Sequence, residues 1–209
     1  MRMDNEGHNM NEESLTPANL SSRERNRIAF FMGFLREPSQ VGSVIPSSRY
    51  LERRIIEAAD LGSARLVVEL GPGTGGTTRA ILRRLGPKAK LLTIDLSSEF
   101  IDLINEIDDP RLINHNGSAE ELSDILAKYG LSAPDVVISG IPFSTMPLQT
   151  GRNIAQAIQD NLADDGRFVA YQFRGDVADI TSPIMGRPSS RMVMRNIPPM
   201  RVYRWQKRS

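Results

Sequence analysis

A short glycine-rich segment after a strongly apolar run is where the residue types of this chain first suggest chemistry. Residues 66–70 are apolar apart from one acid and are typical of a buried strand. Glycines follow at three alternate positions, Gly71, Gly73 and Gly75, and residues 78–85 then carry apolar side chains at helical spacing. Because glycine permits sharp turns and close approach of the backbone to a ligand, this strand, turn and helix N-terminus together predict a nucleotide-binding corner.

Two acidic residues accompany this corner. Glu69 directly precedes the first glycine, and Asp95 follows Gly75 by 20 residues at the end of a second apolar run. Folds of this kind place an acid there that binds ribose hydroxyls. The order E-x-G-x-G-x-G differs from the dinucleotide fingerprint G-x-G-x-x-G, whose helix amides face a pyrophosphate. An acid at position 69 suits a cationic ligand that has no phosphate.

Residues 69–75 resemble motif I of the class I methyltransferases, and Asp95 resembles the ribose-binding acid of those enzymes. The resemblance implies S-adenosylmethionine as the cofactor and S-adenosylhomocysteine as the product. Ser118 stands where an acid often holds the adenine, and its hydroxyl would bind more weakly than a carboxylate. The expected cofactor contacts are Glu69, Gly71, Gly73, Thr74, Gly75, Asp95, Leu96, Ser118, Ala119 and Ser139.

The composition is that of a globular protein without cysteine chemistry. Hydrophobic residues make up 40% and charged residues 24% of 209 residues, with a net charge of +1. The lack of cysteine excludes disulfides, thiolate metal sites and cysteine nucleophiles, and only His8 and His115 offer imidazole, so we expect no metal. Without a signal-peptide pattern or an apolar run of about 20 residues, the expected location is cytoplasmic, with possible peripheral contact at the inner face of the cell membrane.

The rest of the chain alternates strand-like and helix-like segments. Strands are predicted at 65–70, 90–95, 111–114, 135–139 and 167–173, and helices near 75–85, 97–107, 119–129 and 150–163. This rhythm predicts an α/β fold with a Rossmann-like, doubly wound sheet. Residues 191–197 and 200–206 read as two antiparallel strands, which complete a seven-stranded sheet with an antiparallel last strand.

The N-terminal region differs in character from this core. Residues 1–20 are polar and are expected to form a disordered tail, residues 21–60 a helical lid that also contacts the membrane, and residues 61–209 the methyltransferase domain. An apolar helical stripe that includes Phe31 is the substrate-facing or membrane-facing part of the lid, or else it only caps the core. Ser47 and Arg49 are expected to face the substrate. The alternative for the serines is that Ser47 or Ser48 only caps the following helix.

The segment after the fourth strand should border the transferred methyl group. Adenine and amide N-methyltransferases carry Asn or Asp before Pro-Pro-Tyr/Phe or Leu-Pro-Tyr here, and in this chain Gly140 falls at that position. Ser139 or the Gly140 carbonyl is then expected to contact an amine. Phe143 either faces a methylammonium, by a cation–π attraction of about 0.5–2 kcal/mol, or packs in the core.

Several motifs resemble the bacterial phospholipid N-methyltransferases of the Rhodobacter type, which methylate phosphatidylethanolamine and are close to the ribosomal RNA adenine dimethylases. The motifs are residues 46–49 (Pro-Ser-Ser-Arg), residues 69–75, residues 139–142 (Ser-Gly-Ile-Pro) and residues 195–199 (Arg-Asn-Ile-Pro-Pro). The resemblance covers roughly residues 28–206. It implies stepwise methyl transfer to a lipid amine by a peripheral membrane enzyme. Asp95, Ser118 and residues 172–174 depart from the family pattern, which leaves the choice of headgroup open.

Candidate substrate residues follow from this reading. Tyr171, at the end of the fifth strand, or Tyr50 is expected to orient the amine, and Arg174 or Arg187 to hold the lipid phosphate. Seven basic residues and no acid follow position 181, which favours an anionic partner: a phospholipid surface first and nucleic acid second, unless they only form a solvated face. An rRNA adenine methyltransferase and a soluble small-molecule methyltransferase remain the alternatives, and the oligomeric state stays open.

Overall fold

The computed structural model describes residues 48–196 and 198–207. The predictions for the tail, for the stripe with Phe31 and for Ser47 lie outside these residues. The strands are β1 (Leu66–Leu70), β2 (Lys90–Asp95), β3 (Leu112–Asn116), β4 (Val136–Ser139), β5 (Arg167–Gln172), β6 (Ser189–Val193) and β7 (Met200–Gln206). The helices are α2 (Arg49–Ala59), α3 (Gly76–Leu82), α4 (Ser98–Asn105), α5 (Leu122–Lys128), α6 (Leu148–Asn161) and α7 (Asp176–Met185), with short 3-10 turns η2 (Leu61–Ser63) and η3 (Ala119–Glu121).

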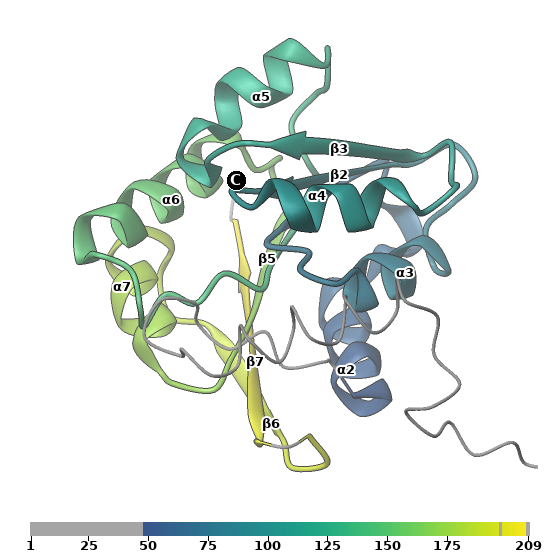
Figure 1. The fold of residues 1–209 in the computed structure, drawn as a ribbon. Coiled ribbons are helices and arrows are strands. Elements are labelled where there is room, and N and C mark those ends of the chain that lie inside the picture. The colour runs from purple at the N-terminus through teal and green to yellow at the C-terminus, as the bar shows by residue number, and fades with distance from the viewer. Residues whose placement is uncertain (1–47, 197, 208–209) are drawn as a thin grey trace, which may run out of the picture.

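The strands form one sheet in the order β3-β2-β1-β4-β5-β7-β6 (Figure 1). β1 to β5 are parallel, whereas β7 runs antiparallel to both β5 and β6. The predicted Rossmann-like sheet with an antiparallel last strand is therefore confirmed. The chain order reverses between β1 and β4, and in open α/β sheets ligands bind at this switch point, beyond the carboxyl ends of the strands.

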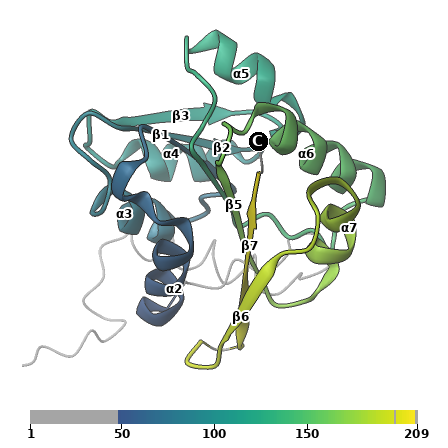
Figure 2. The same cartoon turned by 180° about the vertical axis from the view of Figure 1, so that it is seen from behind.

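Helices cover both faces of the sheet, which explains why the central strands β1 and β4 are mostly apolar runs rather than alternating patterns. Every residue of β1 and β4 is buried. Leu51 and Ile55 of α2 and Ile81 of α3 belong to the core on one face. The core on the other face is built with α5, α6 and α7. Figures 1 and 2 show α2 and α3 on one side of β5 and β7, with α6 and α7 on the other.

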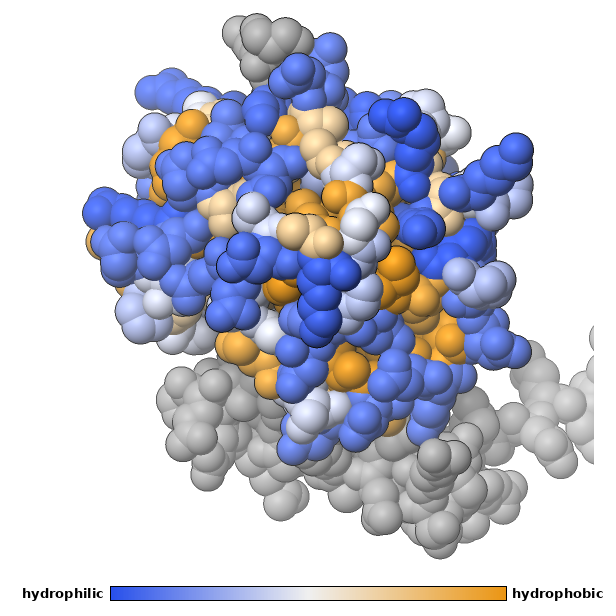
Figure 3. Space-filling view, turned by 90° about the horizontal axis from the view of Figure 1, so that it is seen from above, coloured by the Kyte–Doolittle hydropathy of each residue, from blue (hydrophilic) through white to orange (hydrophobic). Residues whose placement is uncertain are grey.

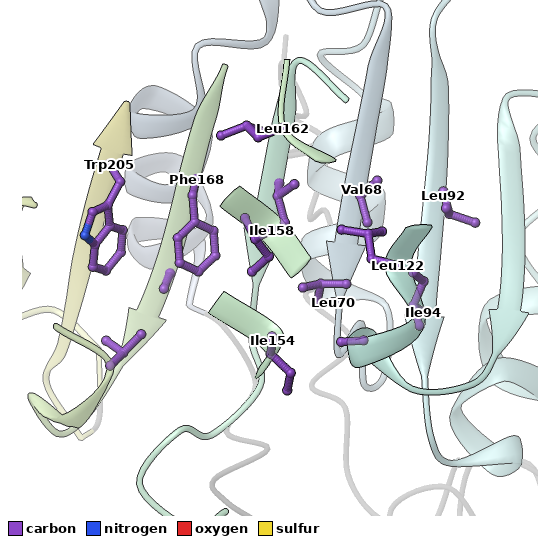
Figure 4. Close-up of a cluster of buried hydrophobic side chains, with 14 of the residues drawn as sticks. Val68, Leu70, Leu92, Ile94, Leu122, Ile154, Ile158, Leu162, Phe168 and Trp205 are labelled. Carbon is purple, nitrogen blue, oxygen red and sulfur yellow. The ribbon is translucent and has the colours of Figure 1, made fainter. Parts of the chain in front are cut away.

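The second core fixes the carboxyl ends of the central strands against α6. In Figure 4, Leu70 of β1 lies near Ile154 of α6, and Phe168 of β5 lies beside Trp205 of β7. The two aromatic rings stack with centroids 4.9 Å apart. Packing of the apolar face of α6 against the strands therefore fixes the carboxyl edge of the sheet, where a ligand would bind.

Two local details differ from the sequence-based expectations. α7 was not predicted: its acidic first turn and Gly186 after its end are helix signals, but Pro183 within it argues against a helix. β6 covers Ser189–Val193 rather than 191–197. After Val193 the chain leaves the ladder, and the Asn196 side chain and the Arg195 carbonyl accept hydrogen bonds from Ser48 before α2.

The face of the molecule that is seen from above is mostly polar (Figure 3). Seen from above, hydrophilic residues cover most of the molecule, and hydrophobic residues show in smaller groups between them (Figure 3). Among the described residues no helix has the length and apolar character needed to cross a membrane.

Candidate active site

The glycine turn after β1 adopts a backbone that side chains disfavour. Gly71, Gly73 and Gly75 have φ values of 72°, 54° and 84°, in the left-handed region where glycine is strain-free. The Gly71 amide donates to the Ile94 carbonyl over 2.9 Å, and the Gly75 amide donates to the Pro72 carbonyl over 3.0 Å. These bonds fold the turn over the carboxyl ends of β1 and β2, as the sequence predicts.

The segment after β4 meets this turn so closely that only glycine fits at position 140. A Cβ atom on Gly140 would collide with the Tyr171 hydroxyl and would lie 2.9 Å from the Gly71 carbonyl oxygen. The structure thus gives a reason for the missing Asn: the Tyr171 hydroxyl takes the space that a side chain at 140 would need. Tyr171 itself is partly buried, and its hydroxyl lies 3.4 Å from Thr77 Oγ1.

A cavity of about 460 Å³ opens beside these two segments. Its size is within the range of small-molecule sites. Seven residues predicted to contact cofactor or substrate line it: Gly71, Gly73, Asp95, Leu96, Ser118, Ala119 and Gly140. The corners after β1, β2, β3 and β4 therefore converge on one space.

Asp95 is fixed at the wall of this cavity by its own loop. Its Oδ1 accepts from the Ser97 amide over 2.9 Å, and the Asn116 side-chain amide donates to the carbonyls of Asp95 and Leu96. Burial raises the pKa of the Asp95 carboxyl, while hydrogen bonds from the amides of Ser97, Gly73 and Leu96 oppose the rise. Leu96 beside it is 77% exposed, which leaves an apolar side chain free to cover a ligand.

Ser118 begins the third corner by capping η3. Its hydroxyl oxygen accepts from the Glu120 amide over 3.2 Å, which leaves its proton free for another acceptor. The Glu120 carboxylate, also on the cavity wall, accepts from the Asn153 side-chain amide over 2.8 Å.

Glu69 lies beneath the glycine turn and is completely buried. Thr78 Oγ1 donates to Glu69 Oε2 over 2.7 Å, whereas Oε1 has no hydrogen-bond partner within the described part of the chain. Burial, and to a smaller extent the charge of Asp95, raise the pKa of this carboxyl against the opposing effect of the Thr78 hydrogen bond, and the resulting pKa is about 8. An orphaned buried oxygen beside the turn fits a cationic ligand placed above it.

Other predicted site residues lie outside the cavity wall. Ser139 is buried, and its hydroxyl oxygen accepts from the Ile141 amide over 3.2 Å, so it shapes the β4 loop. Phe143 is only 1% exposed and packs in the core, which is the second of the two roles expected for it. Thr74 and Gly75 belong to the turn without lining the cavity.

The basic substrate candidates separate along the sheet. Arg174 follows β5 at the carboxyl edge, where it is exposed and lies 3.3 Å from a carboxylate oxygen of Asp176. Arg187 precedes β6. The first residue of β6 pairs with Arg204 of β7, and Arg204 pairs on its other side with Val169 of β5. This register places Arg187 toward the amino end of β5, so the structure does not bring it to the cavity.

Some residues at the site were not identified from the sequence. Gln172 Nε2 donates to the Ile141 carbonyl over 2.7 Å and so anchors the β4 loop. Thr145 and Met146, which precede α6, and Thr150 and Ile154, in its first two turns, also line the cavity. Their only sequence signal is that they follow the β4 segment, because a loop that returns to the site has no fixed spacing.

A curated relative decides the family. The chain is 30% identical over 145 residues to the ornithine lipid N-methyltransferase of Singulisphaera acidiphila, a match that covers 66% of this chain and 73% of the relative. The chain belongs to the class I S-adenosylmethionine-dependent methyltransferases. No family model matches it.

Two further comparisons agree with this assignment. This methyltransferase is 34% identical over 95 residues to the ribosomal RNA small subunit methyltransferase A of Caulobacter vibrioides, covering 44% of this chain and 34% of that one. The N-methyltransferase NodS from Bradyrhizobium japonicum, solved with S-adenosylhomocysteine, superposes with a TM-score of 0.63 at 12% identity over 86% of this chain and 98% of that one. The fold is thus that of an S-adenosylmethionine-dependent enzyme, and S-adenosylmethionine is the cofactor.

Proposed function

We propose that this methyltransferase methylates the amine of a membrane lipid headgroup, with phosphatidylethanolamine (including its methylated intermediates) and ornithine lipid as the two substrates to test first. The observation that carries the proposal is the match to an ornithine lipid N-methyltransferase, which extends over 73% of that relative. The motif resemblance to phosphatidylethanolamine methyltransferases supports the same substrate class.

The cavity residues fit the parts of the cofactor. The Asp95 carboxylate would accept from the ribose hydroxyls, and Leu96 and Ala119 would cover the adenine. The Gly71–Gly73 backbone would lie against the amino-acid end, above the orphaned Glu69 oxygen. When bound, S-adenosylmethionine supplies a methyl group on a positively charged sulfur, and the protein contributes mainly by aligning an amine with it.

The acceptor amine would lie beside Gly140, at the mouth of the cavity. Burial raises the pKa of the Tyr171 hydroxyl, and the nearby Glu69 adds to the rise, so this hydroxyl stays protonated at neutral pH. Tyr171 therefore suits a hydrogen bond that orients the amine rather than a role as phenolate base. His115, on β3, is also not placed to act as the base, because it does not line the cavity; its Nδ1 instead lies 3.1 Å from the Tyr129 hydroxyl.

The carboxyl edge carries features that suit an anionic membrane surface. Phe173 and Met194 are 57% and 71% exposed, and both lie at this edge, after β5 and after β6. Arg174 and Arg195 follow them in the sequence and are exposed as well. Exposed apolar side chains next to cations are the composition that binds lipid interfaces.

The test is methyl transfer from labelled S-adenosylmethionine to vesicles that contain phosphatidylethanolamine, to vesicles that contain ornithine lipid, and to free ethanolamine. We expect labelled lipid in at least one vesicle arm and little product from the free amine. Labelling of the free amine alone, or of no lipid at all, would rule the proposal out.

A second candidate is methylation of an adenine in ribosomal RNA, which the partial match to the Caulobacter enzyme favours. Undermethylated ribosomal RNA in the same assay tests it directly. Position 140 opposes it, because the structure leaves no room there for a side chain that would accept from an adenine amine.

A further inference from the structure

Two arginines from distant parts of the chain converge on one tyrosine at the start of α2. The Arg49 and Arg195 guanidinium carbons lie 5.0 Å and 5.2 Å from the centre of the Tyr50 ring. Arg49 Nη2 also donates to the Tyr50 hydroxyl over 3.0 Å. The hydrogen bond and charge of Arg49, and then those of Arg195, lower the pKa of that hydroxyl, in agreement with the approach of both guanidinium groups to the Tyr50 ring.

The backbone beneath this cluster is locked. Asn196 Oδ1 accepts from the Ser48 amide over 3.1 Å, and the Arg195 carbonyl accepts from the Ser48 hydroxyl over 3.2 Å. Asn196 is 2% exposed, and its side-chain amide donates to the Pro198 carbonyl over 2.9 Å. The backbone positions of the two arginines relative to each other are therefore set by the fold.

The cluster has no counterion within the described part of the chain. No carboxylate of that part lies within ion-pair distance of Arg49 or Arg195. Glu52, the nearest acid along α2, lies 3.4 Å from Arg83 instead. Two like charges held together without a counterion repel each other, so the arrangement favours an anion between them.

The cluster lies on the same edge of the molecule as the cavity. β6 and β7 pair up to Val193 and Met200, one step beyond the last pair of β5, so the turn with Arg195 extends past the carboxyl end of the sheet. One turn into α2, the Glu52 carboxylate lies 3.4 Å from where a Cβ on Gly76 would be, at the start of α3. The start of α2 is thus beside the glycine turn.

We propose that Arg49, Tyr50 and Arg195 form a binding site for the acidic group of the lipid headgroup. In phosphatidylethanolamine this group is the phosphate and in ornithine lipid it is the carboxylate, and each is a short chain away from the amine that receives the methyl. Arginine forks bind both groups by paired hydrogen bonds, and the Tyr50 hydroxyl adds a further donor. The site anchors the headgroup at one end while its amine reaches Gly140. This inference rests on the proposed lipid substrate.

The first experiment compares kcat and KM of Arg195→Gln and Arg49→Gln with the unchanged protein. The substrates, in mixed micelles, are phosphatidylethanolamine, ornithine lipid and a long-chain alkylamine that has no acidic group. Loss of a charge-assisted hydrogen bond is expected to raise KM about tenfold for the lipid whose phosphate or carboxylate binds at this site, with little change in kcat. The KM for the alkylamine should change little, because it has no acidic group. Arg195→Lys should restore part of the loss, because it keeps the charge without the fork.

Arg84→Gln is the matched control, because Arg84 is exposed near the far end of α3 and is not part of the cluster. A rise in KM for phosphatidylethanolamine alone assigns the site to phosphate, and a rise for ornithine lipid alone assigns it to carboxylate. Equal effects on all three substrates, or none beyond those of Arg84→Gln, would overturn the inference.

A binding measurement separates this inference from the proposed function. Calorimetric titration with inorganic phosphate and with acetate needs no methyl transfer. We expect at least one of these anions to bind the unchanged protein more tightly than the double variant Arg49→Gln/Arg195→Gln, whose thermal unfolding should be unchanged. If the anions bind but no lipid is methylated, the proposed function fails and the anion site stands. If lipid is methylated but the two proteins bind the anions equally, the anion site fails alone.

Discussion

Asp95 and Glu69 are two acids at one corner with different surroundings. Asp95 lies on the cavity wall, where amides hold its carboxylate in place, whereas Glu69 is sealed beneath the turn with one oxygen unpartnered. The first can bind a ligand directly. The second is more sensitive to charge in its surroundings, because burial removes the water that would stabilise its ionised form.

Changing Asp95 to Asn is expected to weaken cofactor binding. The substitution keeps the shape but removes the negative charge that accepts from the ribose, which corresponds to about 1.5–3 kcal/mol, or about 10–150-fold in Kd. Titration calorimetry with S-adenosylhomocysteine measures it. Asp102→Asn, on the exposed part of α4, is the control and should bind normally. Unchanged affinity in Asp95→Asn would mean that the ribose lies elsewhere.

Glu69 should make the stability of the cofactor-free protein depend on pH. Its pKa is raised from 4.5 to about 8 in the folded protein, so the folded state holds this proton more tightly than the unfolded state. The stabilisation is complete below about pH 4.5 and is lost as pH rises to about 8. Urea unfolding at pH 5 and pH 8 should therefore show a loss of stability that Glu69→Gln reduces, since Gln can still accept from Thr78. Parallel pH profiles for the two proteins would contradict this.

Residue-level prediction from the sequence succeeded where the backbone itself fixes the residue. Gly71, Gly73 and Asp95 were predicted because the tight turn requires glycine and the end of β2 fixes the position of the acid. All three line the cavity. Phe143 and Tyr171 were both plausible substrate residues, and only packing separates them: Phe143 is in the core, while the Tyr171 hydroxyl lies against Gly140. Side-chain direction after a strand depends on neighbours that the local sequence does not specify.

At the scale of elements, the join between α2 and the turn after β6 connects segments almost 150 residues apart. Ser48 links the two segments through its hydroxyl group. The hydroxyl oxygen caps α2 by accepting from the Leu51 amide over 3.3 Å, and the hydroxyl proton is donated to the Arg195 carbonyl. The sequence indicated the cap, since serines precede the helix. It contained no signal for the partner at Asn196, because the pairing exists only in the folded sheet.

Replacing Ser48 with Ala is expected to destabilise the protein by about 0.5–2 kcal/mol, the usual loss for a helix cap. Urea unfolding measures the change. Ser63→Ala serves as the control, because Ser63 is exposed and makes no described side-chain hydrogen bond, so its effect should stay within about 0.5 kcal/mol. If both variants unfold alike, the cap and the contact with Arg195 contribute nothing measurable.

The elements themselves were predictable to different degrees. The central parallel strands β1, β2, β4 and β5 have apolar runs that can be recognised, because both faces of the sheet are covered there, whereas the edge strand β3 is only partly buried and has just two apolar residues. α7 was missed because Pro183 lies within it, and a proline that far into a segment removes a backbone hydrogen bond and so argues against a helix there.

For the molecule as a whole, the sequence predicted one methyltransferase sheet, and the structure adds an uneven distribution of surface features. The cavity, the Arg49–Tyr50–Arg195 cluster and the exposed Phe173 and Met194 are all at the carboxyl edge. An enzyme whose substrate is embedded in a bilayer must bring that edge to the membrane. The predicted boundary at residue 60, between a helical lid and the methyltransferase domain, stays a prediction. Within the described residues, α2 packs against β5 and β7 as part of the core.

Membrane contact at this edge can be measured directly because the chain has no cysteine. Met194→Cys carries a single environment-sensitive fluorophore at a position that is 71% exposed, and Arg84→Cys carries the same label away from the carboxyl edge. With vesicles of phosphatidylglycerol and phosphatidylcholine, we expect a blue shift at 194 and none at 84. The shift should shrink in high salt, since attraction to anionic lipid is screened. Flotation of the labelled protein with the same vesicles separates the two ways of failing: binding without a shift at 194 would place the contact elsewhere on the chain, and no binding would remove the membrane from the proposal altogether.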